Sequence, residues 1–203
     1  MKEFWDERYA EKGYAYGEDP NVFFREKLDI LEPGRLLLPA DGEGRNSVYA
    51  ASKGWEVNAF DISEAGRKKA IELARRKGVT LTYDVGPLEK HSYKLESFDA
   101  IALIFAHFPA HLKASYHDRF VQLLRPGGTI IFEAFSKNHL KFNSKNPAVG
   151  GPKNEDILYD LDELCNYFDG LNDLETYECE VNLSEGSYHK GTGSVVRFVG
   201  QKK

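Results

Sequence analysis

The chain is organised around RLLLPADGEGRNSVYAA, residues 35–51. The aliphatic run at its start is typical of a strand that is covered on both faces in a parallel sheet. Gly42 and Gly44 follow, and glycine lets the backbone bend sharply and approach a ligand with no Cβ atom in the way. The rest of the stretch reads as a helix whose unpaired N–H groups point into the bend. We therefore predict a strand, a tight glycine turn and a helix.

A second apolar segment, residues 55–60, ends in Asp61, nineteen residues after Gly42. In a strand–helix–strand nucleotide site, an acidic group at the tip of the second strand accepts hydrogen bonds from the ribose hydroxyls of the ligand. Asp61 is the acidic group in that position. It could instead cap the next helix, but Ser63 is the better candidate for the cap, which leaves Asp61 for the ribose. The two segments together predict a site for a ribose-bearing ligand.

The composition limits the possible partners. The chain has 203 residues, with 27 Lys and Arg against 32 Asp and Glu, so its net charge is −5. An acidic chain without a basic patch is not expected to bind nucleic acid or an anionic membrane. Two cysteines without metal-ligand spacing predict neither a metal site nor a disulfide framework. No run resembles a signal peptide or a membrane span, so we expect a cytoplasmic protein; its oligomeric state is left open.

The hydrophobic pattern predicts one domain over residues 1–203. Residues 1–32 form an aromatic helical cap, in which a second helix starts at Asp19-Pro20, and residues 136–160 form a loop or lid. Two final strands, 174–183 and 194–199, are joined by a ten-residue connection and pair antiparallel. The other expected strands are 79–83, 98–105 and 129–135, and the other expected helices are 63–77, 110–124 and 162–168.

These elements predict an α/β fold: a three-layer, Rossmann-like sheet of about seven strands with helices on both faces. The sheet is mostly parallel, with an antiparallel C-terminal strand. Two enzyme classes share the opening motif. A nicotinamide-dependent oxidoreductase is expected to carry a third glycine where Ser47 stands, and a sixth parallel strand. The antiparallel ending favours a methyltransferase instead.

Several motifs, in register with one another, carry a resemblance to a known family. They are Gly42–Asn46 with Asp61–Ser63, Leu124–Gly128 before the fifth strand, and Trp5–Tyr9 with Tyr16 and Gly17. With these motifs the chain resembles the class I S-adenosylmethionine-dependent methyltransferases, closest to the small tellurite-resistance-type and thiopurine-methyltransferase-like enzymes. The resemblance covers most of the chain and implies S-adenosylmethionine as cofactor and a small-molecule acceptor.

The resemblance also implies which residues form the site. The expected cofactor-binding residues are Ala40, Asp41, Gly42, Gly44, Arg45, Asn46, Asp61, Ile62, Asp84, Val85 and Phe105. The expected substrate-side residues are Trp5, Tyr9, Tyr16, His107 and His189, with His107 and Tyr16 as the candidate catalytic groups. A neutral nucleophile needs a proton acceptor, and aromatic faces suit a sulfonium charge. The alternative for the histidines is a structural role. The alternative for the aromatic residues is packing in the core.

The chain departs from the family at the end of the first strand. Relatives usually carry an acidic residue and a further glycine there, where this chain has Leu38, Pro39 and Ala40. Asp41, one step displaced, can take over part of the polar role. Because of this departure, an alternative function stays open, namely that the protein binds S-adenosylmethionine but does not catalyse methyl transfer. The Asn-Pro-Pro-aromatic sequence of relatives that methylate planar amino groups is absent, because residues 105–109 read FAHFP.

Overall fold

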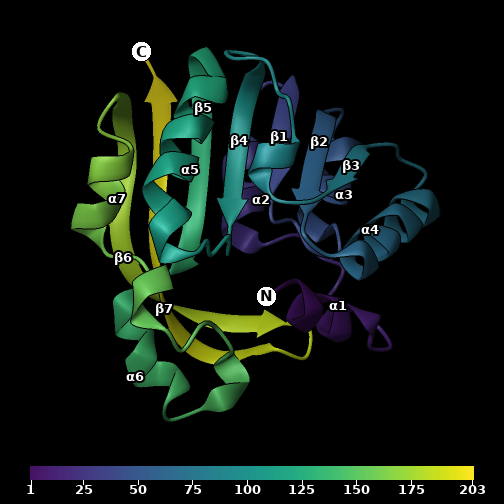
Figure 1. The fold of residues 1–203 in the computed structure, drawn as a ribbon, viewed down its shortest axis with the longest axis vertical. Helices are drawn as coiled ribbons and strands as arrows, with labels where there is room; N and C mark the ends of the chain where they lie inside the picture. The colour runs from purple at the N-terminus through teal and green to yellow at the C-terminus, as the bar shows by residue number, and fades with distance from the viewer.

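The structure is a computed structural model that describes residues 1–203. Seven strands form one sheet in the order β3-β2-β1-β4-β5-β7-β6 (Figure 1). β7 runs antiparallel to both of its neighbours, and the other paired strands are parallel. The strands are β1 Arg35–Pro39, β2 Glu56–Asp61, β3 Thr82–Val85, β4 Phe98–Ile104, β5 Leu124–Phe135, β6 Leu171–Glu185 and β7 His189–Lys202. The predicted fold class is confirmed, and a β6–β7 hairpin stands in place of a sixth parallel strand.

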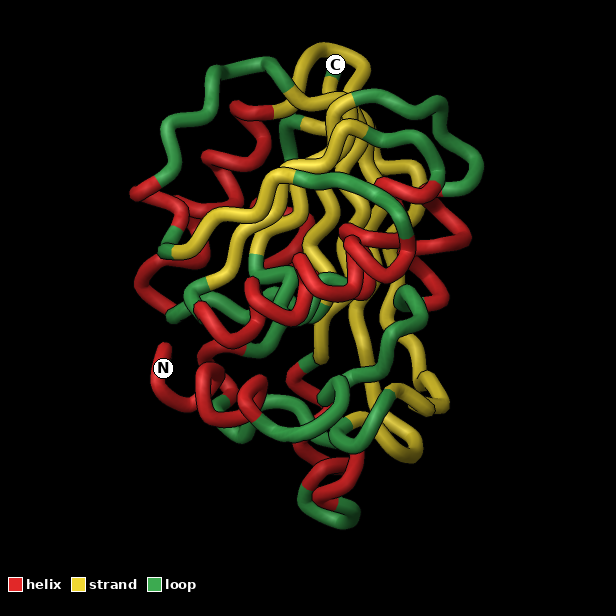
Figure 2. Tube along the Cα trace, turned by 90° about the vertical axis from the view of Figure 1, so that its right-hand side faces the viewer, coloured by secondary structure: helices red, strands yellow, loops and turns green.

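Helices cover both faces of this sheet, which makes three layers (Figure 2). The α-helices are α1 Lys2–Ala10, α2 Val22–Leu28, α3 Arg45–Ser52, α4 Glu64–Lys77, α5 Ala110–Leu123, α6 Leu140–Asn143 and α7 Leu161–Tyr167. Short 3-10 turns are η1 Leu88–Lys90, η2 Lys137–His139, η3 Pro147–Val149 and η4 Glu155–Ile157. None of the helices is both long and apolar enough to cross a membrane.

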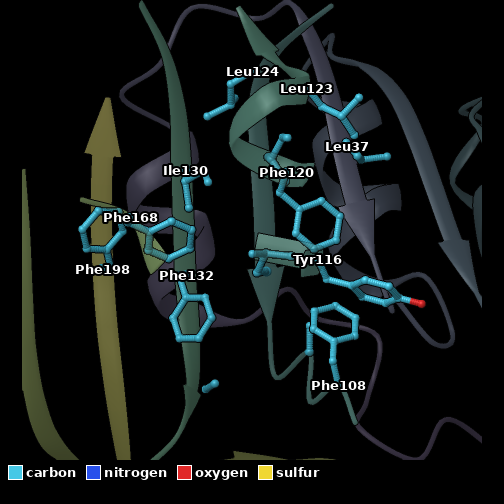
Figure 3. Packing of buried hydrophobic residues seen from close by; sticks show 14 of the residues in the cluster. Leu37, Phe108, Tyr116, Phe120, Leu123, Leu124, Ile130, Phe132, Phe168 and Phe198 are labelled. Carbon is cyan, nitrogen blue, oxygen red and sulfur yellow. The ribbon is translucent and has the colours of Figure 1, made fainter. Parts of the chain in front are cut away.

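The core is divided by the sheet. Side chains of a strand alternate between its faces, so Leu37 packs on one side and Leu36 and Leu38 on the other. The side that includes Leu37 is covered by α5 and α7 and is rich in aromatic rings, with Phe168 stacked on Phe198 at 4.6 Å (Figure 3). The other side is covered by α2, α3 and α4. Burial on both faces explains why β1 and β4 are almost continuously apolar.

Some predicted boundaries are wrong. The second helix begins at Val22, not at Asp19-Pro20, because the Asn21 side chain caps it by accepting from the Phe24 amide at 2.9 Å. The third strand begins at Thr82 instead of residue 79. The predicted helix cap at Ser63 is confirmed, since its hydroxyl accepts from the Gly66 amide at 3.0 Å.

The largest correction concerns the C-terminal hairpin. The predicted ten-residue connection, 184–193, is a turn of three residues, and the strands run on to Glu185 and from His189. The outer half of the hairpin leaves the sheet and passes below the carboxyl ends of the strands toward α1 (Figure 1). Its tip contacts the segment after α1, where the Ser187 amide donates to the Ala15 carbonyl at 2.9 Å. A side chain on Gly186 would lie 2.2 Å from that carbonyl oxygen, so this close approach requires glycine.

The segment expected as a loop or lid, residues 136–160, is folded onto the same end of the sheet. It holds η2, α6, η3 and η4, and a bridge joins Ser136 to Tyr159. The buried Lys113 side chain of α5 donates to the Leu158 carbonyl at 2.7 Å. The segment therefore forms one wall beyond the ends of β4 and β5.

Candidate functional site

The glycine turn links β1 to α3 with a backbone that few residues adopt. Ala40, Gly42 and Gly44 have φ angles of 53°, 61° and 85°. The Tyr83 hydroxyl donates to the Gly42 carbonyl at 2.6 Å. A Cβ atom on Gly42 would lie 2.6 Å from the Tyr9 hydroxyl, so a side chain there would collide with α1. Glycine at this position allows both the bend and the close packing of α1 against it.

Asp61 closes the site from the end of β2. Its carboxylate accepts from the Gly42 amide at 3.0 Å and from the Ser63 amide at 2.9 Å. The side chain is buried, and burial raises its pKa to about 6. The structure thus brings Asp61 into direct contact with the glycine turn, as the spacing predicts. Each amide uses one lone pair of the carboxylate, which leaves acceptor capacity for further donors.

Asp41 is a buried carboxylate without a partner. Neither of its side-chain oxygens has a hydrogen-bond partner, although both are buried. Burial raises its pKa to about 7, with the nearby Asp61 acting in the same direction and Ser47 and Arg45 acting against it. A buried polar group that is left unpaired costs free energy and calls for an explanation. A cation or a hydroxyl group of a ligand at this turn would supply the missing partner.

Helix α1 covers the turn from the N-terminal side. Tyr9 is buried, and Trp5 stacks on it with ring centroids 5.3 Å apart. Asp6 accepts from the Ser63 hydroxyl at 2.6 Å and from the Ala65 amide at 3.2 Å, which fixes α1 to the start of α4. Hydrogen bonds from Lys2 and Ser63 lower the pKa of Asp6 to about 2. Tyr9 therefore lies against the turn, with Trp5 stacked on its ring.

Two of the expected cofactor-binding residues, Asp84 and Val85, lie beside Asp61. Asp84 and Val85 end β3, in register with Phe60 and Asp61. Asp84 is exposed and makes no side-chain hydrogen bond, and Val85 and Ile62 are half-buried. A ligand that contacts Asp61 would meet the end of β3 next.

Arg45 and Asn46 are buried at the start of α3 and bind other parts of the protein. Arg45 forms an ion pair with Glu185 at 3.0 Å, and the Asn46 side chain accepts from the Asn21 amide at 2.9 Å. Asn21 also donates to the buried Glu133 of β5 at 2.7 Å. These contacts tie α3 to the hairpin tip and to the segment before α2. Both residues are thus occupied within the protein.

Aromatic and histidine rings gather at the ends of β4 and β5. Phe105 has a φ angle of 52°, which is uncommon for an aromatic residue, and packs on Phe135 with a centroid distance of 4.7 Å. His189 lies 4.5 Å from the Tyr16 ring and 4.9 Å from the Phe105 ring. His107 stacks on Phe135 at 5.8 Å. The predicted substrate-side groups Tyr16, His107 and His189 are therefore brought to one aromatic cluster.

His107 is held by one ring nitrogen only. Nδ1 donates to the Ile157 carbonyl at 2.9 Å, while the buried Nε2 has no partner. Burial lowers the pKa of His107 to about 4, so the ring is neutral at neutral pH. Its free nitrogen is an acceptor of low basicity.

Sequence reasoning missed several residues of this region. They are Asn21, Tyr83, Glu133, Phe135, His139 and Glu185. Glu185 contacts Arg45 across 140 positions of the chain, a separation that leaves no signal in local spacing. No group of three or more His, Cys, Asp or Glu side chains is arranged to hold a metal ion, and both cysteines are free.

The chain is similar in sequence to methyltransferases. A model of a methyltransferase domain matches residues 39–128. An uncharacterized protein of Mycobacterium tuberculosis is 33% identical over 105 residues, which are 49% of this chain and 37% of that protein. The chain thus spans little more than a third of that relative. Thiopurine S-methyltransferase of Vibrio atlanticus is 23% identical over 152 residues, 64% of this chain and 68% of the enzyme.

Solved structures share the fold at low sequence identity. A structure concerned with the conversion of a disulfide bond into a thioacetal group in echinomycin biosynthesis has a TM-score of 0.78 and 17% identity. It is aligned over all of this chain and 92% of its own length. TehB from Haemophilus influenzae has a TM-score of 0.71 and 16% identity, over all of this chain and 67% of TehB.

Proposed function

We propose that this chain is a class I S-adenosylmethionine-dependent methyltransferase that transfers a methyl group from S-adenosylmethionine to a small-molecule nucleophile. The observation that carries the proposal is the glycine turn with two carboxylates beside it. Asp61 is bound to Gly42 and retains acceptor capacity, and Asp41 is buried without a partner. A ligand with both ribose hydroxyls and an ammonium group suits that pair.

The residues at the turn fit this cofactor in chemistry. Asp61 would accept from the ribose hydroxyls, and Asp41 would face the positively charged amino-acid end, taking over part of the role that an acidic residue at the end of the first strand plays in relatives. Val85 and Asp84 would flank adenine. A cation beside Asp41 would lower the pKa of its carboxyl, which burial now raises to about 7. The cofactor would thus satisfy the group that lacks a partner.

S-adenosylmethionine supplies an electrophilic methyl group on a sulfonium. The protein's part is to align the acceptor with that methyl group and to exclude water. Trp5 and Tyr9 on α1, and Phe105 and Tyr16 on the opposite side, offer aromatic faces that suit a positive charge.

A small acceptor fits the enclosure of this end of the molecule. The site is bordered by α1, by the hairpin tip and by the folded segment 136–160 (Figure 1). The chain carries a net charge of −5 and has no basic patch in its sequence, so a polyanionic nucleic acid is disfavoured. The relative named thiopurine S-methyltransferase makes a sulfur nucleophile the first class to test.

The experiment is a turnover assay with S-adenosylmethionine and a panel of thiols, a thiopurine, phenols and amines. We expect S-adenosylhomocysteine to form only when an acceptor is present, and the D61A variant to lose that activity. Failure of the wild-type protein to bind S-adenosylmethionine would overturn the proposal. Tight binding without turnover on any acceptor would favour a binding protein instead.

A further inference from the structure

A carboxylate and an imidazole face each other at the tip of the β6–β7 hairpin. Glu185 ends β6 and pairs directly with His189, the first residue of β7. His189 Nδ1 lies 2.8 Å from a Glu185 oxygen. Arg45 contacts the same carboxylate at 3.0 Å, and the side-chain amide of Asn21 donates a hydrogen bond to it at 3.3 Å. Burial favours the neutral acid, but His189 and Arg45 outweigh it and lower the pKa of Glu185 to about 2. Glu185 is therefore ionised.

The Glu185 contact determines which nitrogen of His189 carries the proton. An ionised carboxylate can only accept hydrogen bonds, so Nδ1 must be the N–H donor. The lone pair of the neutral ring is then on Nε2, which has no hydrogen-bond partner in the structure. Burial lowers the pKa of His189, against the opposing effect of Glu185, which keeps the ring neutral at neutral pH. His189 thus presents a free proton acceptor within an aromatic cluster.

The other two histidines of this cluster are less suited to accept a proton. Both nitrogens of His139 are engaged, one with the Gly150 carbonyl at 3.0 Å and the other with the Ser194 amide at 3.3 Å. His107 has a free Nε2, but its Nδ1 contacts a neutral carbonyl, which stabilises an imidazolium less than a carboxylate does. Of the three rings, only His189 combines a free nitrogen with an ionised partner.

We propose that His189 is the general base of the methyl transfer and that Glu185 is its positioning residue, an inference that rests on the function proposed above. The acceptor's bond to hydrogen breaks and the proton passes to His189 Nε2. The acceptor atom bonds to the methyl carbon as the methyl–sulfur bond breaks, and the sulfur keeps that electron pair. The resulting imidazolium is stabilised by Glu185 and returns its proton to solvent.

The arrangement also defines the class of acceptor. A base is useful only to a nucleophile that arrives protonated, such as a phenol, a thiol of high pKa or a ring N–H. Rings lie on several sides of His189, at 4.5 Å for Tyr16, 4.9 Å for Phe105 and 5.3 Å for Phe135. The acceptor assigned to this site is therefore a neutral, hydrogen-bearing and mainly apolar molecule, not a carboxylate.

Several charged and titratable groups influence His189. Glu185 favours the protonated ring, whereas Arg45 of α3 and Arg8 of α1 disfavour it. The imidazoles of His107 and His139 also act on it, and both are neutral when His189 is. Because Glu185 is the one group that favours the charged ring, its removal should lower the pKa of His189 further.

The first test does not depend on turnover. Nitrogen-15 NMR of the histidine rings, with His189 assigned by the H189Q variant, reports the tautomer and the pKa of each ring. We expect His189 in the Nδ1–H form at neutral pH, with a pKa that falls in the E185Q variant. A His189 ring in the Nε2–H form, or a pKa that E185Q does not change, would overturn the inference.

The second test separates base catalysis from folding and binding. With a phenol or thiol from the panel, we expect H189Q to reduce kcat about 100-fold and E185Q about 10-fold. The Kd of S-adenosylmethionine should stay within twofold, and H189Q should lose the fall of kcat at acid pH. H111Q, on the exposed side of α5, is the matched control. If the wild type turns over and H189Q retains its kcat, this inference fails while the proposed function stands; if the wild type does not bind S-adenosylmethionine, both fail.

Discussion

At the scale of single residues, Asp61 joins the two segments that the sequence singles out. Its carboxylate accepts hydrogen bonds from two backbone amides, one in the glycine turn and one at the start of α4. We predict that D61A weakens the binding of S-adenosylmethionine by about 1 to 3 kcal/mol, because a charged hydrogen bond to the ribose is lost. Isothermal titration calorimetry measures the change. D118A, at an exposed position of α5, is the control, and an unchanged Kd in D61A would contradict the role given to Asp61.

The raised pKa of Asp41 should make the free energy of unfolding depend on pH. Its pKa is about 7 in the folded protein, against roughly 3.9 in an unfolded chain. Between these values the unfolded chain binds fewer protons, so stability falls as pH rises from about 4 to about 7, and the loss persists above pH 7. Asp61, with a pKa of about 6, acts in the same direction.

We therefore predict that D41N stabilises the unliganded protein at pH 8 but not at pH 4. The gain at pH 8 is on the order of 1 kcal/mol for each unit by which the pKa of Asp41 is raised. Urea denaturation at the two pH values measures it, with D118N as control. Equal effects of D41N at pH 4 and pH 8 would show that ionisation of Asp41 is not the cause.

How far residues can be predicted from sequence depends on how local their signal is. Gly42, Gly44 and Asp61 are found from spacing because a strand–turn–helix unit and the next strand tip fix their relation. Glu185 and Asn21 are missed because each acts through partners far away in the chain. The lack of a hydrogen-bond partner for Asp41 likewise depends on the residues around it, so it is visible only in the structure.

At the scale of elements, α1 is held beside the glycine turn by contacts with the start of α4. Asp6 provides two of them, to the Ser63 hydroxyl and the Ala65 amide. We predict that D6A speeds amide hydrogen exchange in α1 about tenfold or more and weakens S-adenosylmethionine binding, because Tyr9 is then held less firmly against Gly42. Hydrogen–deuterium exchange with mass spectrometry measures the first effect. E7A, an exposed α1 substitution, is the control; equal exchange in D6A and E7A would contradict this view.

Elements with local stop signals are predicted well, and those ended by tertiary contact are not. Helix α4 starts at its Ser63 cap and ends before Gly78, which has a φ of 69°. The hairpin tip carries glycines and polar residues and therefore resembles a long loop in sequence. Contacts with residues 15–17 and the pairing of Glu185 with His189 extend its strands instead.

At the scale of the whole molecule, segments from both ends of the chain meet at the carboxyl edge of the sheet. Helix α1 packs against the glycine turn, which Asp61 contacts, and the hairpin tip brings His189 and Glu185 to the rings at the ends of β4 and β5. Figure 1 shows α1 and the curved end of the hairpin beyond the carboxyl ends of the strands. The residues proposed to bind the cofactor and those proposed to act on the acceptor thus come from elements that are distant in sequence. The fold class follows from strand patterns, whereas this assembly follows from the packing of α1 and the hairpin.

The central claim is that the turn and Asp61 bind S-adenosylmethionine. Calorimetric titration of the wild-type protein with S-adenosylmethionine, and in parallel with NAD and NADP, tests it most directly. We predict saturable one-to-one binding of S-adenosylmethionine that D61A weakens, and no comparable heat with either dinucleotide. Preference for a dinucleotide, or no binding of S-adenosylmethionine at all, would contradict the account.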